Sequence, residues 1–380
     1  MVTGGNSVSF RCRGCTGENV VQVVDLGDQP TADLFPTADT PGPDPRHPLS
    51  LWLCRDCTLV QLGPVEAQIA EEPLAVESAT SLAHAESSVK EILRDYPELA
   101  GGAVFEFGSP HGGSWLDHLY AAGSRLAGDG EKADLVIDVH GLVHEPDMGA
   151  SFRLRAERLA PGGLLVMEFH HLLPLFIGNQ FDTIRHGHWV YQSLRAVSYI
   201  ANLHGLAIES VKHVEMFGGS LMVMLRHTAE AKPDASVDVV LADEEAAGIA
   251  DEIQLASLQE AAQHAAGALH AELTRHKVAG RKVLGYGAPS KAPVLLDLSE
   301  VGTDLLEFTV DKALGKHGRR IPGGCMVPIR PVEELMAAWP VVVLVLTWDI
   351  AEEVIAQLEA DGGWGATYLV PLPEPHELRR

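Results

Sequence analysis

The sequence has few basic residues for its length. Its 28 lysines and arginines stand against 52 aspartates and glutamates, which gives a net charge of −24. An acidic protein surface repels nucleic acids and anionic membranes. We therefore expect neither nucleic acid nor a membrane as a partner.

Long apolar runs are also missing. No run approaches the roughly 20 residues that cross a bilayer. The first fifteen residues, MVTGGNSVSFRCRGC, contain no apolar core of a secretory signal. These features predict a cytoplasmic protein.

Cysteine is scarce, with five residues in 380, but four of them form two CxxC pairs. The pairs are Cys12 with Cys15 and Cys54 with Cys57. In a reducing compartment such thiols are more often metal ligands than disulfides. Two CxxC pairs complete a tetrahedral zinc site, which is normally structural because no coordination position stays open. Redox-active or free thiols are the alternative interpretation.

The chain is too long for one hydrophobic core, and its pattern predicts two α/β lobes. A strand at 103–107, a glycine-rich turn at 108–113 and a helix from about 115 open the first lobe. A strand at 282–286 and the turn 287–291 open the second in the same way. A long helix at 243–276 would connect the lobes.

Histidines follow several predicted strands of the first lobe. The strand 164–169 delivers Glu168, and then His170 and His171. His140 follows the strand 134–139. Ligands of open α/β sheets gather at the carboxyl ends of strands, so these side chains should face one cleft.

Two interpretations of these histidines compete. The first is a second metal site, such as zinc or non-haem iron, with open coordination positions. Its candidate ligands are His111, His140, His144, Glu168, His170, His171, His186 and His188. His140 and His144 would share one face of a helix, because they are four residues apart. The second interpretation is a polar lining that binds substrate hydroxyls without metal.

Several motifs together resemble the zinc-containing, S-adenosylmethionine-dependent nucleotide-sugar C-methyltransferases of deoxysugar biosynthesis. The four cysteines resemble the zinc-binding domain of that family, and 106–109 (EFGS) resembles its methyl-donor motif. Residues 181–184 (FDTI), with His186 and His188, resemble the signature FDTIYHEH. Residues 285–291 (GYGAPSK) resemble the loop GYGAPAKG, which handles the sugar nucleotide.

The resemblance implies three parts and assigns site residues to two of them. The parts are a zinc-binding domain at 1–66, a truncated methyltransferase-like α/β domain at 67–240, and a linker helix with a Rossmann-like lobe at 241–380. The residues implied for the methyl donor are Gly108, Ser109, His111 and Gly112. Those expected to bind a nucleotide-sugar substrate are Tyr286, Gly287, Ala288, Pro289, Ser290, Lys291, Arg319 and Arg320. A solvated surface pair is the alternative for the two arginines.

The sequence departs from the family at the residues of the chemistry. Only 25 residues separate Gly108 from Asp134. A second strand, its helix and a third strand do not fit there, given typical element lengths. We therefore expect the adenosine platform to be deleted. The tyrosine and glutamate of YHEH are replaced by Arg185 and Gly187.

The leading hypothesis is an enzyme that acts on a nucleotide-linked keto sugar or a related natural product without transferring methyl. His188 would be the general base, and Arg185 or His186 would stabilise an enolate, with Glu168 beside them. One alternative is an S-adenosylmethionine-dependent C-methyltransferase with an unusual donor site. The other is a non-catalytic binding protein that keeps only its zinc and nucleotide sites.

Overall fold

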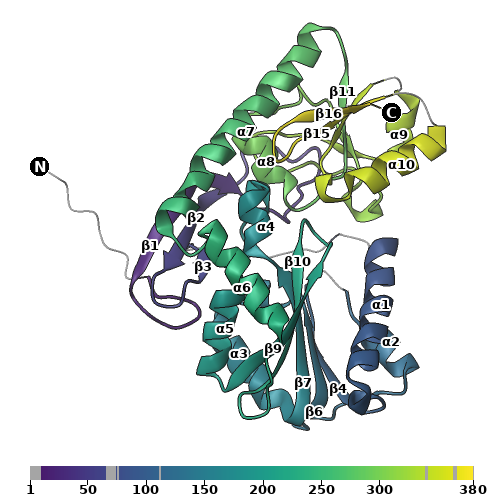
Figure 1. Ribbon diagram of the computed structural model, residues 1–380. Coiled ribbons are helices and arrows are strands. Elements are labelled where there is room, and N and C mark those ends of the chain that lie inside the picture. The colour runs from purple at the N-terminus through teal and green to yellow at the C-terminus, as the bar shows by residue number, and fades with distance from the viewer. Residues whose placement is uncertain are drawn as a thin grey trace, which may run out of the picture.

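The computed structural model describes residues 10–65, 74, 77–110, 113–338, 341–362 and 366–379. The described chain forms three sheets, each the centre of one part of the molecule (Figure 1). The prediction of a zinc-binding domain followed by two Rossmann-like α/β lobes is confirmed. Among the described residues, no helix is long and apolar enough to cross a membrane.

The N-terminal sheet is antiparallel and has the order β1-β2-β3-β8. Its strands are β1 (Val20–Pro30), β2 (Arg46–Cys54), β3 (Val60–Leu62) and β8 (Val190–Tyr191). The first three strands come from the cysteine-bearing segment, whereas β8 comes from the middle of the chain. This sheet therefore joins the N-terminal segment directly to the segment that follows His188.

The central lobe is built on a six-stranded sheet of order β5-β4-β6-β7-β10-β9. Its strands are β4 (Ala103–Phe107), β5 (Arg125–Leu126), β6 (Ala133–Val139), β7 (Leu159–His170), β9 (Leu206–Val214) and β10 (Ser220–His227). The first four strands in that order run parallel, and β10 is antiparallel to both of its neighbours. Strand β7 is buried over most of its length, as its apolar run predicts.

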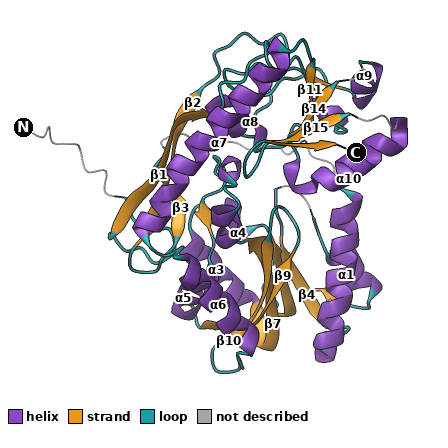
Figure 2. Cartoon of the chain, turned by 45° about the horizontal axis from the view of Figure 1, so that its top comes forward, coloured by secondary structure: helices purple, strands orange, loops and turns teal. Residues whose placement is uncertain are grey.

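Helices cover both faces of the central sheet (Figures 1 and 2). On one face lie α1 (Ala79–Asp95) and α2 (Leu116–Ala121), and on the other lie α3 (Met148–Arg158), α5 (Leu194–Leu203) and α6 (Ala235–Ala247). The short helix α4 (Leu172–Ile177) follows β7. Short 3-10 turns at Pro97–Leu99, Leu142–His144 and Phe181–Thr183 complete this part of the chain.

The C-terminal lobe has a sheet of order β13-β12-β11-β14-β15-β16, in which the first five strands are parallel. Its strands are β11 (Val283–Tyr286), β12 (Thr309–Val310), β13 (Ile329–Arg330), β14 (Val342–Val345), β15 (Thr367–Val370) and β16 (His376–Arg379). Its helices are α7 (Glu252–Val278), α8 (Ala292–Leu298), α9 (Val332–Ala337) and α10 (Ala351–Gly362), with 3-10 turns at Leu314–Lys316 and Trp348–Ile350.

Two sequence-based expectations need correction. The helix expected over 243–276 is two helices, α6 and α7, because Gly248 adopts a left-handed conformation (φ +68°) that ends α6. The helix expected to carry His140 and His144 on one face does not form. His140 ends β6 with φ +52°, and His144 lies in the 3-10 turn that follows.

The edge of the central sheet beside β4 is short. The sequence predicts that a second strand, its helix and a third strand are missing between Gly108 and Asp134. A second strand is present, as the two-residue β5, which pairs with β4. Beyond β5 the described chain adds no strand to this edge, and it continues into β6. The consequence for the methyl donor stays a prediction.

Candidate functional site

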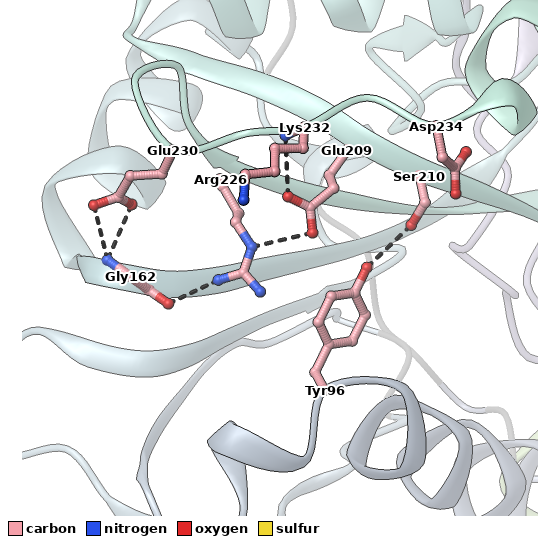
Figure 3. Close-up of a pocket in the computed structure, with 8 residues that line it drawn as sticks. All are labelled: Tyr96, Gly162, Glu209, Ser210, Arg226, Glu230, Lys232 and Asp234. Atoms are coloured by element: carbon pink, nitrogen blue, oxygen red, sulfur yellow. Dashed lines mark hydrogen bonds and ion pairs between the residues drawn. The ribbon is translucent and has the colours of Figure 1, made fainter.

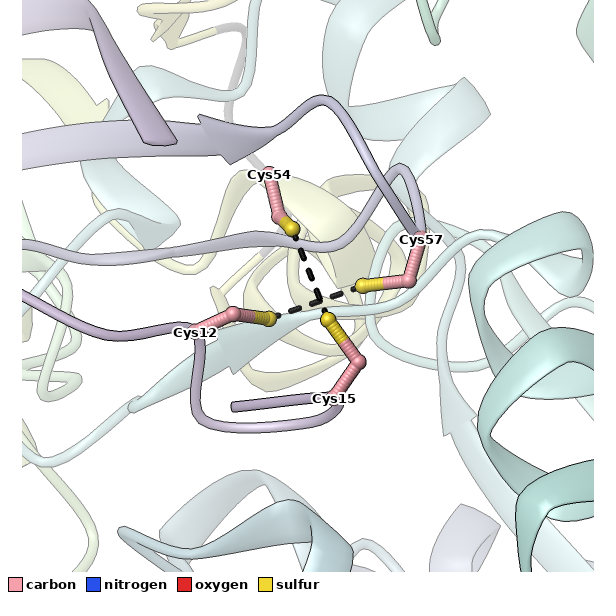
Figure 4. A group of neighbouring side chains, drawn as sticks. All are labelled: Cys12, Cys15, Cys54 and Cys57. Carbon is pink, nitrogen blue, oxygen red and sulfur yellow. Dashed lines mark hydrogen bonds between the residues drawn. The ribbon is translucent and has the colours of Figure 1, made fainter. Parts of the chain in front are cut away.

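The four cysteine sulfurs converge on one point (Figure 4). The Sγ atoms of Cys12 and Cys57 are 3.5 Å apart, and those of Cys15 and Cys54 are 3.6 Å apart. Zinc–sulfur bonds of about 2.3 Å place tetrahedral ligands about 3.8 Å apart, so the four thiolates fit a zinc ion. Both CxxC turns fold alike, because Thr16 and Thr58 donate backbone hydrogen bonds to Cys12 and Cys54. A closed four-sulfur site stabilises the fold and leaves no position for chemistry.

Glu168, at the carboxyl end of β7, holds two imidazoles. Its Oε2 lies 2.7 Å from His84 Nε2, and its Oε1 lies 3.2 Å from His140 Nε2. The Glu168 side chain is fully buried, and both of its oxygens are engaged. Sequence analysis missed His84, although it lies on α1, the helix that packs against this face of the sheet. Its position on an amphipathic helix was the signal available.

Three further histidines extend this group into a cluster. The His170 ring centroid is 4.5 Å from that of His140 and 5.6 Å from that of His188. The His188 ring is in turn 5.2 Å from His144. His170 and His188 line a narrow cavity of about 10 Å³. We call His84, His140, His144, Glu168, His170 and His188 the histidine cluster.

The electrostatics of the histidine cluster follow from burial and pairing. Burial opposes the ionisation of Glu168, but its bonds to His140 and His84 outweigh burial and lower its pKa to about 2. The bond to Glu168 raises the pKa of His84. Burial, followed by the positive charge of His140, lowers the pKa of His170 well below its ordinary value. Glu168 is therefore an anion at neutral pH and His170 is a neutral base.

The cluster is organised by hydrogen bonds and ring contacts. Among the described side chains, no three predicted ligands of the second metal site bring ligand atoms within 4.8 Å of one another. His111 and Gly112 lie outside the described residues. The other predicted ligands lie in the histidine cluster, except for His171 and His186.

His171 and His186 lie apart from the cluster. His171 Nε2 is 2.8 Å from Glu244 Oε1, and Glu244 also accepts hydrogen bonds from the backbone at the start of α5. His186 Nε2 lies 3.2 Å from the carbonyl oxygen of Pro48, on the N-terminal sheet. Both contacts connect structural elements. Of the two histidines that follow the FDTI segment, His188 thus lies in the cluster and His186 contacts the N-terminal domain.

The turn after β4 contains the donor residues that were predicted, of which Gly108 and Ser109 are described. A Cβ at Gly108 would meet no described atom within 4 Å. The carboxylate of Glu106 accepts hydrogen bonds from Trp115 N (2.7 Å) and Ser114 Oγ (2.5 Å), which close the turn.

The glycine-rich turn of the C-terminal lobe connects β11 to α8, in the strand–turn–helix order that was predicted. Gly287 has φ +90°, and a Cβ there would lie 2.7 Å from Thr347, so the position requires glycine. Asp311, at the end of β12, accepts a hydrogen bond from Ala288 N at 2.7 Å. An acidic residue at the end of the second strand is the ribose ligand of many Rossmann-like sites. Sequence analysis missed Asp311, which its place 24 residues after Gly287 could have indicated.

The motifs of the two lobes meet in one polar cluster. Lys291 forms an ion pair with Asp349, and its Nζ lies 3.8 Å from the Trp348 ring centroid. Trp348 Nε1 donates a hydrogen bond of 2.7 Å to Asp182 of the FDTI segment. Burial raises the pKa of Asp182 to about 6, although the charge of Lys291 and the Trp348 bond act in the opposite direction.

Asp33 of the N-terminal domain contacts both lobes. Its Oδ2 lies 2.8 Å from Arg185 Nη1, and its Oδ1 accepts a hydrogen bond from Ser290. The Arg185 and Asp33 side chains are both buried. Arg185, which was predicted to stabilise an enolate, is therefore paired within the interface.

Arg319 and Arg320 form hydrogen bonds with the N-terminal domain. Arg319 Nη1 donates to the Phe35 carbonyl at 2.7 Å. Arg320 is buried and donates to both carboxylate oxygens of Asp44, at 2.5 and 2.8 Å. These contacts differ from the phosphate-binding role expected from the sequence, and also from a solvated pair.

A larger hollow of about 500 Å³ lies at the opposite end of the central sheet (Figure 3). Gly162, on its floor, comes six residues before Glu168 on the same strand. Its charged side chains bond to their neighbours, with Arg226 on Glu209 and Glu230 on the backbone of Gly162. This hollow is remote from the histidine cluster.

Comparison with known proteins agrees with this division of the chain. A zinc binding domain model matches residues 12–68, and a C-methyltransferase C-terminal domain model matches residues 215–373. The chain is 29% identical over 409 residues to the C-methyltransferase NovU from Streptomyces niveus, a match that covers 97% of this chain and 96% of NovU. The chain thus contains the zinc binding domain and the C-terminal domain of C-methyltransferases, and it is an enzyme related to them.

Solved structures similar to the chain include two methyltransferases. An S-adenosylmethionine-dependent methyltransferase from Mesorhizobium loti is 18% identical, and the match covers 38% of this chain and 98% of that one, with a TM-score of 0.27. Magnesium protoporphyrin IX methyltransferase from Synechocystis PCC 6803 is 15% identical, with 38% and 83% covered and a TM-score of 0.29.

Proposed function

We propose that the protein acts on a nucleotide-linked keto sugar, or a natural-product intermediate derived from one, by histidine-based proton transfer. The histidine cluster carries this proposal. It places an anionic carboxylate, two imidazoles bonded to it and a neutral buried imidazole at the carboxyl ends of β6 and β7. This is the edge of an α/β sheet where ligands bind.

His188 is proposed as the general base. It lines the narrow cavity with His170 and packs against that ring, so one imidazole supports the orientation of the other. In the proposed step, the C–H bond α to the substrate carbonyl breaks and its proton passes to the imidazole. The electron pair moves to the carbonyl oxygen, and the proton then returns to carbon.

Substrate binding is proposed at the adjoining turn of the C-terminal lobe. Residues 286–291 and Asp311 would receive the nucleotide, with Asp311 toward the ribose and the Lys291 ammonium toward the diphosphate. The polar cluster around Lys291 and Asp182 lies between this turn and the signature loop. The substrate would therefore bridge the two lobes, with its sugar toward His188.

Methyl transfer is the second candidate, because the similarity to NovU extends over nearly the whole chain. S-Adenosylmethionine would supply the methyl group at the turn after β4. The described part of this sheet edge ends at the two-residue β5, whereas strands average about five to six residues. This edge fits an adenosine platform poorly.

Deuterium exchange, read together with methylation in the presence of S-adenosylmethionine, separates the two candidates. A dTDP-linked keto sugar is incubated with the protein in D₂O, with and without S-adenosylmethionine, and its mass is followed. The proposal expects a mass gain of one unit per exchanged α hydrogen without the donor, and loss of that gain in His188→Ala but not in the exposed control His264→Ala.

Three outcomes would contradict the proposal. Exchange at the wild-type rate in His188→Ala would show that His188 is not the general base. A mass gain of 14 that depends on S-adenosylmethionine, together with calorimetric binding of the donor, would instead establish methyl transfer. Absence of both reactions, with the keto sugar still bound, would favour a binding protein.

A further inference from the structure

The end of helix α7 meets the last strand at a group of three side chains that the proposed function does not use. Glu272 and His276 lie four residues apart on α7, so they share a helix face. Glu377 comes from β16. One ligand atom from each residue lies within 4.8 Å of the other two.

His276 is the unusual member of this group. Its side chain is fully buried, and neither ring nitrogen has a hydrogen-bond partner. Nevertheless, Nε2 lies 3.1 Å from Glu272 Oε1 and 3.5 Å from Glu377 Oε1. The nitrogen thus approaches two carboxylate oxygens without the angle of a hydrogen bond. A buried polar atom without such a partner is costly and calls for an explanation.

These distances are those of donor atoms around a common cation. Bonds of about 2.0–2.1 Å to a tetrahedral zinc ion separate nitrogen and oxygen ligands by about 3.3 Å. We propose that Glu272, His276 and Glu377 form a second site for a divalent transition-metal ion of the zinc type. The site is separate from both the four cysteines and the histidine cluster.

Arg275 supplies positive charge to the same carboxylates. Its Nη2 lies 2.6 Å from Glu377 Oε1, and its guanidinium also bonds to both oxygens of Glu272. The Arg275 side chain is half exposed, so it can turn toward solvent. The guanidinium and the metal ion are alternative partners of the two carboxylates.

The neutral state of the imidazole agrees with this assignment. Burial, and then the charges of Arg281 and Arg275, lower the pKa of His276, which favours the neutral ring with one unprotonated nitrogen. Metal binding requires the neutral imidazole. A bound ion would join the end of α7 to β16, and three protein ligands would leave a fourth position to water.

Cobalt titration tests the site in the full-length protein with zinc in the cysteine site. Zinc retention is checked by elemental analysis, and cobalt bound to thiolates would be recognised by its sulfur charge-transfer absorption. We expect one equivalent of Co²⁺ to bind with absorption bands of nitrogen and oxygen ligands only. In Arg275→Gln, which removes the competing cation, binding should tighten about tenfold or more.

Two ligand variants and two controls complete the test. Glu377→Gln, on the last strand, and His276→Gln should each abolish cobalt binding in the Arg275→Gln background. His264→Gln, an exposed histidine of the same helix, and Asp304→Asn, in the exposed pair with Lys277, should bind as tightly as the wild type. Circular dichroism establishes that each variant is folded. Failure of Arg275→Gln to bind cobalt, or unchanged binding in folded Glu377→Gln, would overturn the proposal.

Discussion

At the scale of single residues, Glu168 determines the charge state of the histidine cluster. It is buried and bonded to His84 and His140, so its carboxylate stays charged when the protein is folded. The sequence indicated that Glu168 and the nearby histidines form a site. It could not indicate that His84, more than 80 positions earlier, would complete the group, because the contact depends on how α1 packs.

Glu168→Gln should lower the proposed exchange activity by about 10²-fold or more, because the two imidazoles lose their anionic partner. The amide keeps the shape of the side chain, so the variant should still fold. Steady-state rates across pH are the measurement. Glu230→Gln, at the other end of the same sheet, is the matched control and should keep full activity. Equal rates in both variants would contradict the assignment.

Asp182 should give the protein a measurable dependence of stability on pH. Its folded-state pKa is raised to about 6, so between about pH 4 and 6 the folded chain holds a proton that the unfolded chain has lost. Stability should therefore fall as pH rises through this window, by up to about 3 kcal/mol.

Urea unfolding at pH 4, 5, 6 and 7 measures this effect. Asp182→Asn keeps the acceptor for Trp348 but cannot titrate, so its free energy of unfolding should vary less with pH than that of the wild type. The exposed control Asp304→Asn should follow the wild-type curve. Parallel curves for the wild type and Asp182→Asn would show that Asp182 is charged throughout the window.

At the scale of elements, apolar strands were the most predictable feature. The strand expected at 103–107 is β4, with the same bounds, and the one expected at 282–286 is β11, which begins one residue later. Single-residue backbone conformations were not predictable. The left-handed Gly248 divides the expected connector helix, and the left-handed His140 replaces an expected helix by a strand end and a 3-10 turn. Such conformations are set by tertiary contacts, which local periodicity does not record.

Gly248→Ala should destabilise the protein by about 1 kcal/mol or more, because a left-handed conformation disfavours a Cβ. The added atom would also meet the Gln254 side chain at 2.9 Å. Gly267→Ala is the matched control, since Gly267 lies inside α7 with open space around it. That change should instead stabilise the protein by about 1 kcal/mol or less. Chemical unfolding measures the free energy of unfolding of both variants. If both changes stabilised the protein, Gly248 would have a helical and not a left-handed conformation.

At the scale of the whole molecule, the zinc-binding domain shares one sheet with the segment that follows His188, the proposed base. Strand β3 pairs with β8, with Val60 opposite Tyr191, and β8 begins two residues after His188. The sequence predicted the zinc site from spacing alone. It did not predict this pairing, because β8 is only two residues long and lies far from β3 in the chain.

Cys12→Ser should lower the zinc content and also the activity, although the thiolates take no part in the reaction. Loss of the metal frees the segment around β3, and β8 then loses its partner. Elemental analysis measures the zinc content, and activity is assayed in parallel. Hydrogen exchange at Val190 and Tyr191 reports whether β8 is still paired with β3. Cys325→Ala is the control and should retain zinc, since Cys325 is buried away from the four ligands. Zinc-depleted protein with full activity would refute the coupling.

The position of Asp33 limits how far this enzyme can be treated as a set of interchangeable modules. One carboxylate joins the N-terminal domain to Arg185 of the central lobe and to Ser290 of the C-terminal lobe. The family loop GYGAPAKG has alanine at the place of Ser290, so a C-terminal lobe grafted from such a relative would lack the hydroxyl that Asp33 binds. Recombination of these proteins to change their substrates should therefore work best when residues 33, 185 and 290 come from the same parent protein.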